Sequence, residues 1–130
     1  MTRAIIGLFL VMSTTVPLRA ETPETVMVTL RAKTGAEAEV ATILARHWTI
    51  ARTLNLLDDT THFTMKTRDA DGRVTFVDVF TWRDASIPDA ASPEILAVWK
   101  EMTRLAEVRD GRPGLEIVEV NLIQDARRRD

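Results

Sequence analysis

Two residues of this sequence are placed to do acid–base chemistry together. The chain has no cysteine, no tyrosine and only two histidines, which excludes a thiolate nucleophile, a Cys-ligated metal and an all-histidine metal cage. His47 falls on the apolar stripe of a predicted helix, and Asp78 lies between Phe76 and Phe80 in a predicted strand. If the two side chains meet, they form a catalytic acid–base pair that can take a phenolic proton from an aromatic substrate. The alternatives are a structural hydrogen bond, or an aspartate that faces solvent at a strand irregularity.

Aromatic side chains form a second candidate set. Three tryptophans could stack on a planar ligand, and Trp82 at a strand end is the best placed of them for the mouth of a cavity. Ordinary core packing is the alternative. The residues predicted to bind a ligand are Trp48, Trp82, Trp99, Phe63, Phe76, Phe80 and Met102. We expect no metal and no resident cofactor, with haem binding through His47 or His62 as the alternative.

Six predicted elements position these residues. The helices show apolar residues at spacings of three and four, and the strands show alternation or continuous apolar runs. The order strand, helix, strand, strand, helix, strand predicts a ferredoxin-like α+β fold, in which a four-stranded antiparallel sheet carries two helices on one face. The predicted ranges are strands at 26–31, 60–68, 73–82 and 115–123, and helices at 36–54 and from 92 to about 109.

The hairpin loop at 69–72 decides which side chains share a face of the sheet. We assume that Arg68 pairs with Arg73. This register places Phe63 on the helix-covered face beside Asp78. It places His62 on the opposite face, where we expect it to be exposed near the start of its strand, with a polar lining of the barrel interior as the alternative.

The opposite face of the sheet is also apolar. Two helices cover only one face, so the other would expose an apolar patch in a monomer. The sequence therefore predicts a homodimer in which two sheets pack face to face. The apolar residues that we expect on this face are Val77, Val79, Val118, Val120 and Leu122.

The strand that ends in Phe80-Thr81-Trp82-Arg83, the loop after it and the following Ser92-Pro93 resemble the dimeric α/β-barrel superfamily, and most closely its antibiotic biosynthesis monooxygenase-like domains. The resemblance covers about residues 25–123 and is a match of pattern rather than of a diagnostic motif. It implies a ligand cavity between sheet and helices, and relatives that include cofactor-free oxygenases of polycyclic phenols and haem-degrading enzymes. This chain lacks a histidine at 89–93 and on its second helix, which weighs against both chemistries.

The N-terminal residues have the pattern of a secretory signal peptide. A basic start, an apolar run and Ala20 at a plausible cleavage site predict a leader at 1–20, although a strand or a membrane anchor is the alternative. The domain would then span 21–124, and a charged tail 125–130. The chain carries a formal net charge of −2, and loss of Arg3 and Arg19 with the leader makes it more acidic, which argues against a nucleic-acid partner.

Together these features predict a periplasmic or secreted homodimer without stable membrane insertion after the leader is removed. It would bind a small apolar or aromatic molecule between sheet and helices. Cofactor-independent oxygenation is one function of such a cavity, and a non-catalytic ligand-binding or accessory role is the alternative.

Overall fold

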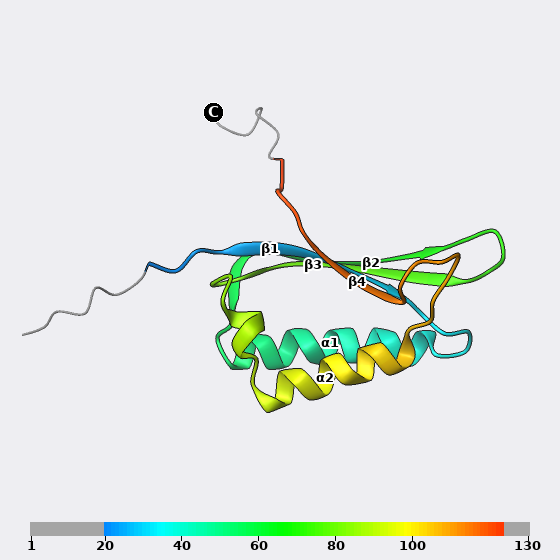
Figure 1. Cartoon of the computed structure of the whole chain (residues 1–130), viewed down its shortest axis with the longest axis horizontal. Helices are drawn as coiled ribbons and strands as arrows, with labels where there is room; N and C mark the ends of the chain where they lie inside the picture. Colours follow the sequence, from blue (N-terminus) through cyan, green and yellow to red (C-terminus); the bar gives the residue numbers. More distant parts are fainter. Residues whose placement is uncertain (1–19, 124–130) are drawn as a thin grey trace, which may run out of the picture.

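A computed structural model describes residues 20–123 as one helix-covered sheet (Figure 1). The sheet has four antiparallel strands in the order β2-β3-β1-β4, and both long helices lie against the same face. This arrangement confirms the predicted ferredoxin-like fold. The elements are β1 (Glu24–Arg31), α1 (Glu37–Thr53), β2 (Leu57–Arg68), β3 (Val74–Trp82), the short 3-10 helix η1 (Ile87–Ala90), α2 (Pro93–Leu105) and β4 (Leu115–Glu119).

The predictions for the ends of the chain lie outside the described residues. The leader predicted at 1–20, apart from its last residue, and the tail predicted at 125–130 both fall there. Within residues 20–123, no helix is both long enough and apolar enough to cross a membrane.

Local signals account for the two long helices. Ser92 caps α2 by accepting a hydrogen bond from the Ile95 backbone N–H at 3.4 Å, and Pro93 occupies the first helical turn, where its missing N–H costs nothing. In both helices the buried positions recur every three or four residues, so each helix turns one face toward the sheet. These positions are Val40, Ile43, Leu44, His47 and Ala51 in α1, and Ile95, Val98, Met102 and Leu105 in α2.

The hairpin between β2 and β3 has a different register from the predicted one. Arg68 lies opposite Val74 rather than Arg73, a shift of one residue. The Asp69 side chain organises the turn, because its carboxylate accepts hydrogen bonds from the backbone N–H groups of Asp71 and Arg73. Gly72 then takes a φ of +82°, a conformation that only glycine adopts without strain.

This one-residue shift turns the side chains of β2 from His62 to Arg68 to the other face of the sheet. Thr64 lies opposite Asp78, and His62 lies opposite Phe80 after an irregularity that begins at Asp58. His62 is therefore on the helix-covered face, and its predicted place on the open face is wrong. Phe63 is on the open face with 43% of its surface exposed, so its predicted place beside the helices is also wrong.

The open face of the sheet carries a group of apolar side chains, including the predicted Val77, Val79 and Val118, among threonines and other polar residues. Phe63 lies opposite Val79 in the β2–β3 ladder, and Val118 lies opposite Met27 in the β1–β4 ladder. Phe63, Met65 and Val118 are exposed on this face in the single chain.

Candidate functional site

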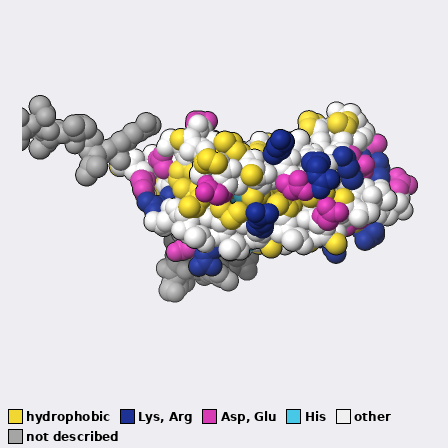
Figure 2. All heavy atoms as spheres, turned by 90° about the horizontal axis from the view of Figure 1, so that it is seen from below, with side chains coloured by type: hydrophobic (Ala, Val, Ile, Leu, Met, Phe, Trp, Pro, Cys, Tyr) yellow, Lys and Arg dark blue, Asp and Glu magenta, His cyan; other side chains and the backbone are white. Residues whose placement is uncertain are grey.

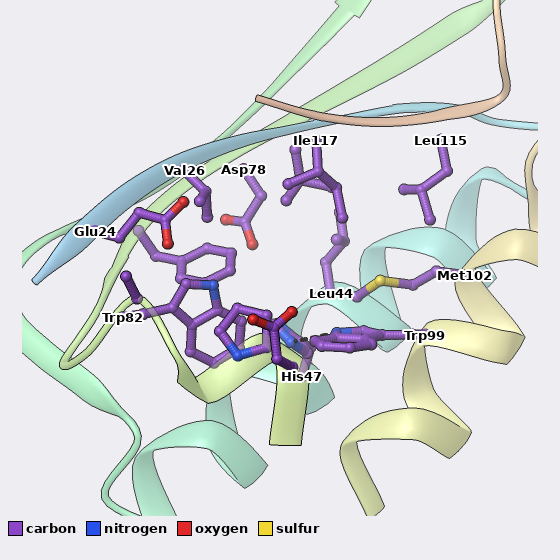
Figure 3. Close-up of a pocket in the computed structure, with 15 residues that line it drawn as sticks. Glu24, Val26, Leu44, His47, Asp78, Trp82, Trp99, Met102, Leu115 and Ile117 are labelled. Carbon is purple, nitrogen blue, oxygen red and sulfur yellow. Dashed lines mark hydrogen bonds between the residues drawn. The ribbon is translucent and has the colours of Figure 1, made fainter. Parts of the chain in front are cut away.

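A cavity of about 350 Å³ lies between the sheet and the helices, at the end where β3 leads into η1 (Figure 3). Its walls come from β1, β3, β4, α1, α2 and the η1 loop. It contains most of the side chains that the sequence predicted for catalysis or ligand binding. These are His47, Asp78, Phe80, Trp82, Trp99 and Met102.

His47 is a neutral hydrogen-bond donor toward the cavity. Its side chain is only 3% exposed, and its Nε2 accepts a hydrogen bond from Trp99 Nε1 at 3.1 Å. An indole N–H can only donate, so Nε2 carries no proton and the neutral ring holds its proton on Nδ1. Burial lowers the pKa of His47; Asp78 partly offsets this effect and His62 adds to it. His47 is therefore uncharged at neutral pH.

Asp78 is a buried carboxylate with one engaged oxygen. It is 2% exposed, and its Oδ1 accepts hydrogen bonds from His62 Nε2 at 2.9 Å and from Thr64 Oγ1 at 2.8 Å. In the described part of the chain, no hydrogen bond joins it to His47. The predicted His47–Asp78 pair is replaced by a His62–Asp78 pair because the shifted register brings β2's polar side chains under the helices.

His47 and Asp78 each have one polar side-chain atom without a hydrogen-bond partner in the part of the chain that the structure describes. Across residues 20–123, Arg109 Nε is the one side-chain nitrogen or oxygen that is fully buried without a hydrogen-bond partner. Asp78 Oδ2 and His47 Nδ1 have no such partner among the described residues either, so both atoms must be accessible from the cavity. Figure 3 shows the Asp78 carboxylate directed from the sheet toward the layer of rings.

Four rings enclose this end of the cavity at steep angles to one another. Trp82 meets Phe80 at an interplanar angle of 84° and Trp99 at 75°, with centroid separations of 4.9 and 6.2 Å. The His47 ring lies at 90° to Trp82. Edge-to-face packing of this kind is favourable for the rings themselves, and it also builds a box with aromatic walls.

The other predicted ligand-binding residues lie away from the cavity. Trp48 stacks on the His62 ring with centroids 3.6 Å apart, and the Arg52 guanidinium lies 5.6 Å from its centroid. Phe76 is buried in the closely packed part of the core, and Phe63 is on the open face. Trp48 thus covers the His62–Asp78 pair at the sheet edge instead of stacking on a ligand.

Sequence reasoning missed two acidic residues that line the cavity. Glu24 at the start of β1 lies directly opposite Trp82, and Asp89 belongs to η1. The pairing of β1 with β3 was the signal that could have placed Glu24. Asp89 sits in a connecting loop, where no periodicity indicates which side chains turn inward.

The site does not fit an axial haem ligand or a metal cluster. Both histidines have Nε2 engaged, His47 with Trp99 and His62 with Asp78. Within residues 20–123, no group of three or more His, Asp or Glu side chains is arranged to hold a metal ion.

No protein-family profile and no curated protein matches the chain. Solved structures do resemble it. Rv0793 from Mycobacterium tuberculosis has a TM-score of 0.57 at 16% identity, and the match covers 81% of this chain and 99% of that one. A variant of SnoaB from Streptomyces nogalater, described as a cofactor-independent oxygenase, has a TM-score of 0.60 at 19% identity over 80% and 96% of the two chains.

A dimeric ferredoxin-like protein of unknown function from Jannaschia sp. CCS1 has a TM-score of 0.58 at 20% identity, with coverage of 78% and 100%. Such low identities establish a common fold and nothing about activity. The chain therefore shares the ferredoxin-like fold of these structures, which is the fold that the resemblance in its sequence implied.

Proposed function

We propose that this chain is an exported, homodimeric domain that binds a small aromatic or apolar molecule in the cavity between sheet and helices. The observation that carries the proposal is an aromatic-walled cavity into which two buried polar atoms, His47 Nδ1 and Asp78 Oδ2, remain free to bond. Ligand sites in proteins are typically roughly 300–1,000 Å³, mostly apolar, with a few oriented polar groups. The cavity here has this size and this composition.

The energetics of the two polar residues support a ligand. A buried carboxylate with an unpaired oxygen is costly, and so is a buried imidazole whose remaining N–H has no partner. At the other end of the same face, β1 and β3 bury apolar side chains such as Leu30, Val74 and Phe76 under the helices, so the fold does not require a polar residue there. A ligand with complementary hydrogen-bonding groups would satisfy both.

The homodimer is supported by the apolar open face and by the neighbour from Jannaschia, which is described as dimeric. Two copies of the sheet packed face to face would remove Phe63, Met65 and Val118 from water. Light scattering during size-exclusion chromatography should give twice the monomer mass. Phe63→Glu should give the monomer mass, because it puts a charge into the proposed contact, and a monomeric parent protein would refute the dimer.

Export is supported by the sequence pattern at 1–20. Expression of the full chain in a Gram-negative host, followed by mass spectrometry of the periplasmic fraction, should identify a protein that begins at Glu21. Recovery of uncleaved chain in the cytoplasm alone would contradict export.

Binding can be tested by calorimetric titration with naphthylmethanol, a neutral aromatic probe. Ile117 lines the cavity and is 57% exposed, so Ile117→Phe should narrow the cavity at little cost to the fold and weaken binding. The adjacent Val118 points to the other face and is 46% exposed, so Val118→Phe is a matched control that should bind like the parent. Absence of binding, or equal binding by both variants, would overturn the proposed site.

A cofactor-independent oxygenase is the second candidate, because SnoaB has that description and shares the fold. Oxidation of an activated ring CH₂ by O₂ gives a carbonyl and one water, which balances without a cofactor. Asp78 Oδ2 would take the first proton, and His47 Nδ1–H would stabilise the oxygen that gains charge. For an enzyme of this kind Asp78→Asn abolishes oxygen consumption but not binding of the substrate. For a binding protein, no added aromatic compound stimulates oxygen consumption in the parent.

A further inference from the structure

The cavity is acidic and contains no basic side chain. Its lining includes the carboxylates of Glu24, Asp78 and Asp89, whereas no lysine or arginine lines it. His47, the remaining titratable group, is neutral because burial lowers its pKa. Glu24 lies opposite Trp82 and Asp78 lies opposite Val28, so one residue pair on that face of the sheet lies between them, and Figure 3 shows both carboxylates on the sheet side of the rings. Any ligand therefore meets these carboxylates with no lysine or arginine in the lining, and His62, the basic group that bonds Asp78 Oδ1, lies outside the lining.

The rest of the protein surface is not uniformly acidic. In Figure 2, which views the helix side, most basic side chains lie in the right half, whereas acidic side chains are spread over both halves. Several basic groups are already paired, as Arg73 is with Asp69 and Arg104 with Glu101. Acidic side chains such as Asp69 and Glu101, outside the cavity, thus have arginine partners, whereas the lining of the cavity offers its carboxylates no lysine or arginine.

The aromatic walls complement this charge. The faces of Phe80, Trp82 and Trp99 carry the negative side of the ring quadrupole and attract cations. Their mutual angles of 75–84° present rings on more than one side of the same space. Aromatic rings set at steep angles together with a carboxylate are the groups that recognise an ammonium ion in an otherwise apolar site.

From these features we propose that the ligand carries a positive charge, an aromatic or apolar amine whose ammonium group is anchored by Asp78 Oδ2. This assignment rests on the proposed function of the same cavity. The ammonium would satisfy the unpaired carboxylate oxygen and lie against the ring faces, and Glu24 and Asp89 would favour its entry. The apolar part of the ligand would extend toward the aliphatic lining at Leu44 and Met102.

The same electrostatics disfavour anions. A carboxylate ligand would face Glu24 and Asp78 in a site of low polarity, where like charges repel strongly. A phenolate produced by proton abstraction would meet the same repulsion. The charge of the cavity therefore favours a binding role over oxygenation that begins with a phenolate.

Three probes of matched shape and different charge test the assignment. Naphthylmethylamine, naphthylmethanol and naphthoic acid are cationic, neutral and anionic at neutral pH, and each is titrated calorimetrically into the intact protein. We expect the amine to bind about tenfold more tightly than the alcohol, and the acid more weakly than the alcohol. Asp78→Asn should remove most of the amine's advantage and leave the affinity for the alcohol nearly unchanged.

Glu24→Gln provides a second variant if Asp78→Asn does not fold, and it should reduce the preference for the amine by a smaller factor. Asp71→Asn, at the exposed tip of the hairpin, changes the net charge equally and should leave the preference intact. Equal binding of all three probes, or tightest binding of the acid, would overturn the cationic ligand while leaving the cavity as a binding site. Failure of every probe to bind would overturn the proposed function and this assignment with it.

Discussion

The two ends of the helix-covered face differ in how closely they are packed and in which polar groups they bury. Toward the end of β1, Leu30, Val74 and Phe76 pack against both helices without a cavity, and Arg109 closes that end by bonding the backbone carbonyls of Ala32 and Val74. Toward the start of β1, the same layer holds a cavity, a buried histidine and a buried aspartate. The first end is closely packed with apolar side chains, apart from the buried Arg109, whereas the second end keeps buried polar groups beside a cavity.

The largest expected effect is at the closed end. Leu30→Ala should lower the free energy of unfolding by about 2–5 kcal/mol, because it removes a fully buried side chain from a closely packed cluster. Urea denaturation followed by circular dichroism measures the loss. Leu96→Ala on the exposed face of α2 is the matched control and should cost far less. Similar losses in both variants would mean that the closed end is not the stable part of the fold.

The helices and the buried faces that form the two ends could largely be predicted from local sequence patterns. Ser92-Pro93 specified the start of α2, and the period of apolar residues specified which face of α1 is buried, including His47. The continuous apolar run of β3 predicted a strand that needs cover on both faces of the sheet. Each of these signals depends on neighbours within a few residues, so the sequence alone contains them.

The partner of Asp78 could not be predicted in the same way. It depends on whether the hairpin closes with Arg73 opposite Arg68 or opposite Asp69, and both closures suit the residues of the loop. The Asp69 carboxylate decides between them by bonding backbone N–H groups, which is a property of the folded turn. The cavity likewise arises from the way two helices and the η1 loop meet the sheet, and no short segment encodes it.

Lowering the pH should decrease the stability of the folded protein through His47, at the cavity end of the domain. Burial lowers the pKa of His47 in the folded protein, so the unfolded chain binds the proton first as the pH falls. The free energy of unfolding is therefore unaffected by the titration of His47 above about pH 6.5, and it decreases as the pH falls from there through the folded pKa. The loss is about 1.4 kcal/mol for each unit by which the pKa is lowered. Urea denaturation between about pH 7.5 and 5 measures it.

His47→Leu removes this titration and should flatten the pH dependence over the same range. His62→Gln is the control that keeps His47 in place and should retain the dependence. An unchanged slope in His47→Leu would show that another group causes the loss of stability, and the cavity end would then not be the acid-sensitive part of the domain.

The hydrogen bond from Trp99 to His47 should have a smaller effect. Trp99→Phe removes the indole donor and should cost about 0.5–1.5 kcal/mol of stability. Nitrogen-15 spectra of the imidazole should show the parent His47 with its proton on Nδ1, and the variant with a mixture of both neutral forms. Trp48→Phe keeps the donor and should leave the His47 spectrum unchanged. A parent spectrum with the proton on Nε2 would contradict the orientation of the ring.

The smallest effects expected are opposite changes in the pKa of His47. Asp78 raises that pKa and His62 lowers it, so Asp78→Asn should move it further below its ordinary value and His62→Gln should move it back up. The chain has only two histidines, so a titration followed by NMR resolves each ring, and His62→Gln also assigns the signals. Asp71→Asn, remote from the cavity, should leave the His47 titration where it is. If both variants shift the pKa in the same direction, a change in burial outweighs the local charges, and the Asp78 carboxylate is not the electrostatic centre of the cavity.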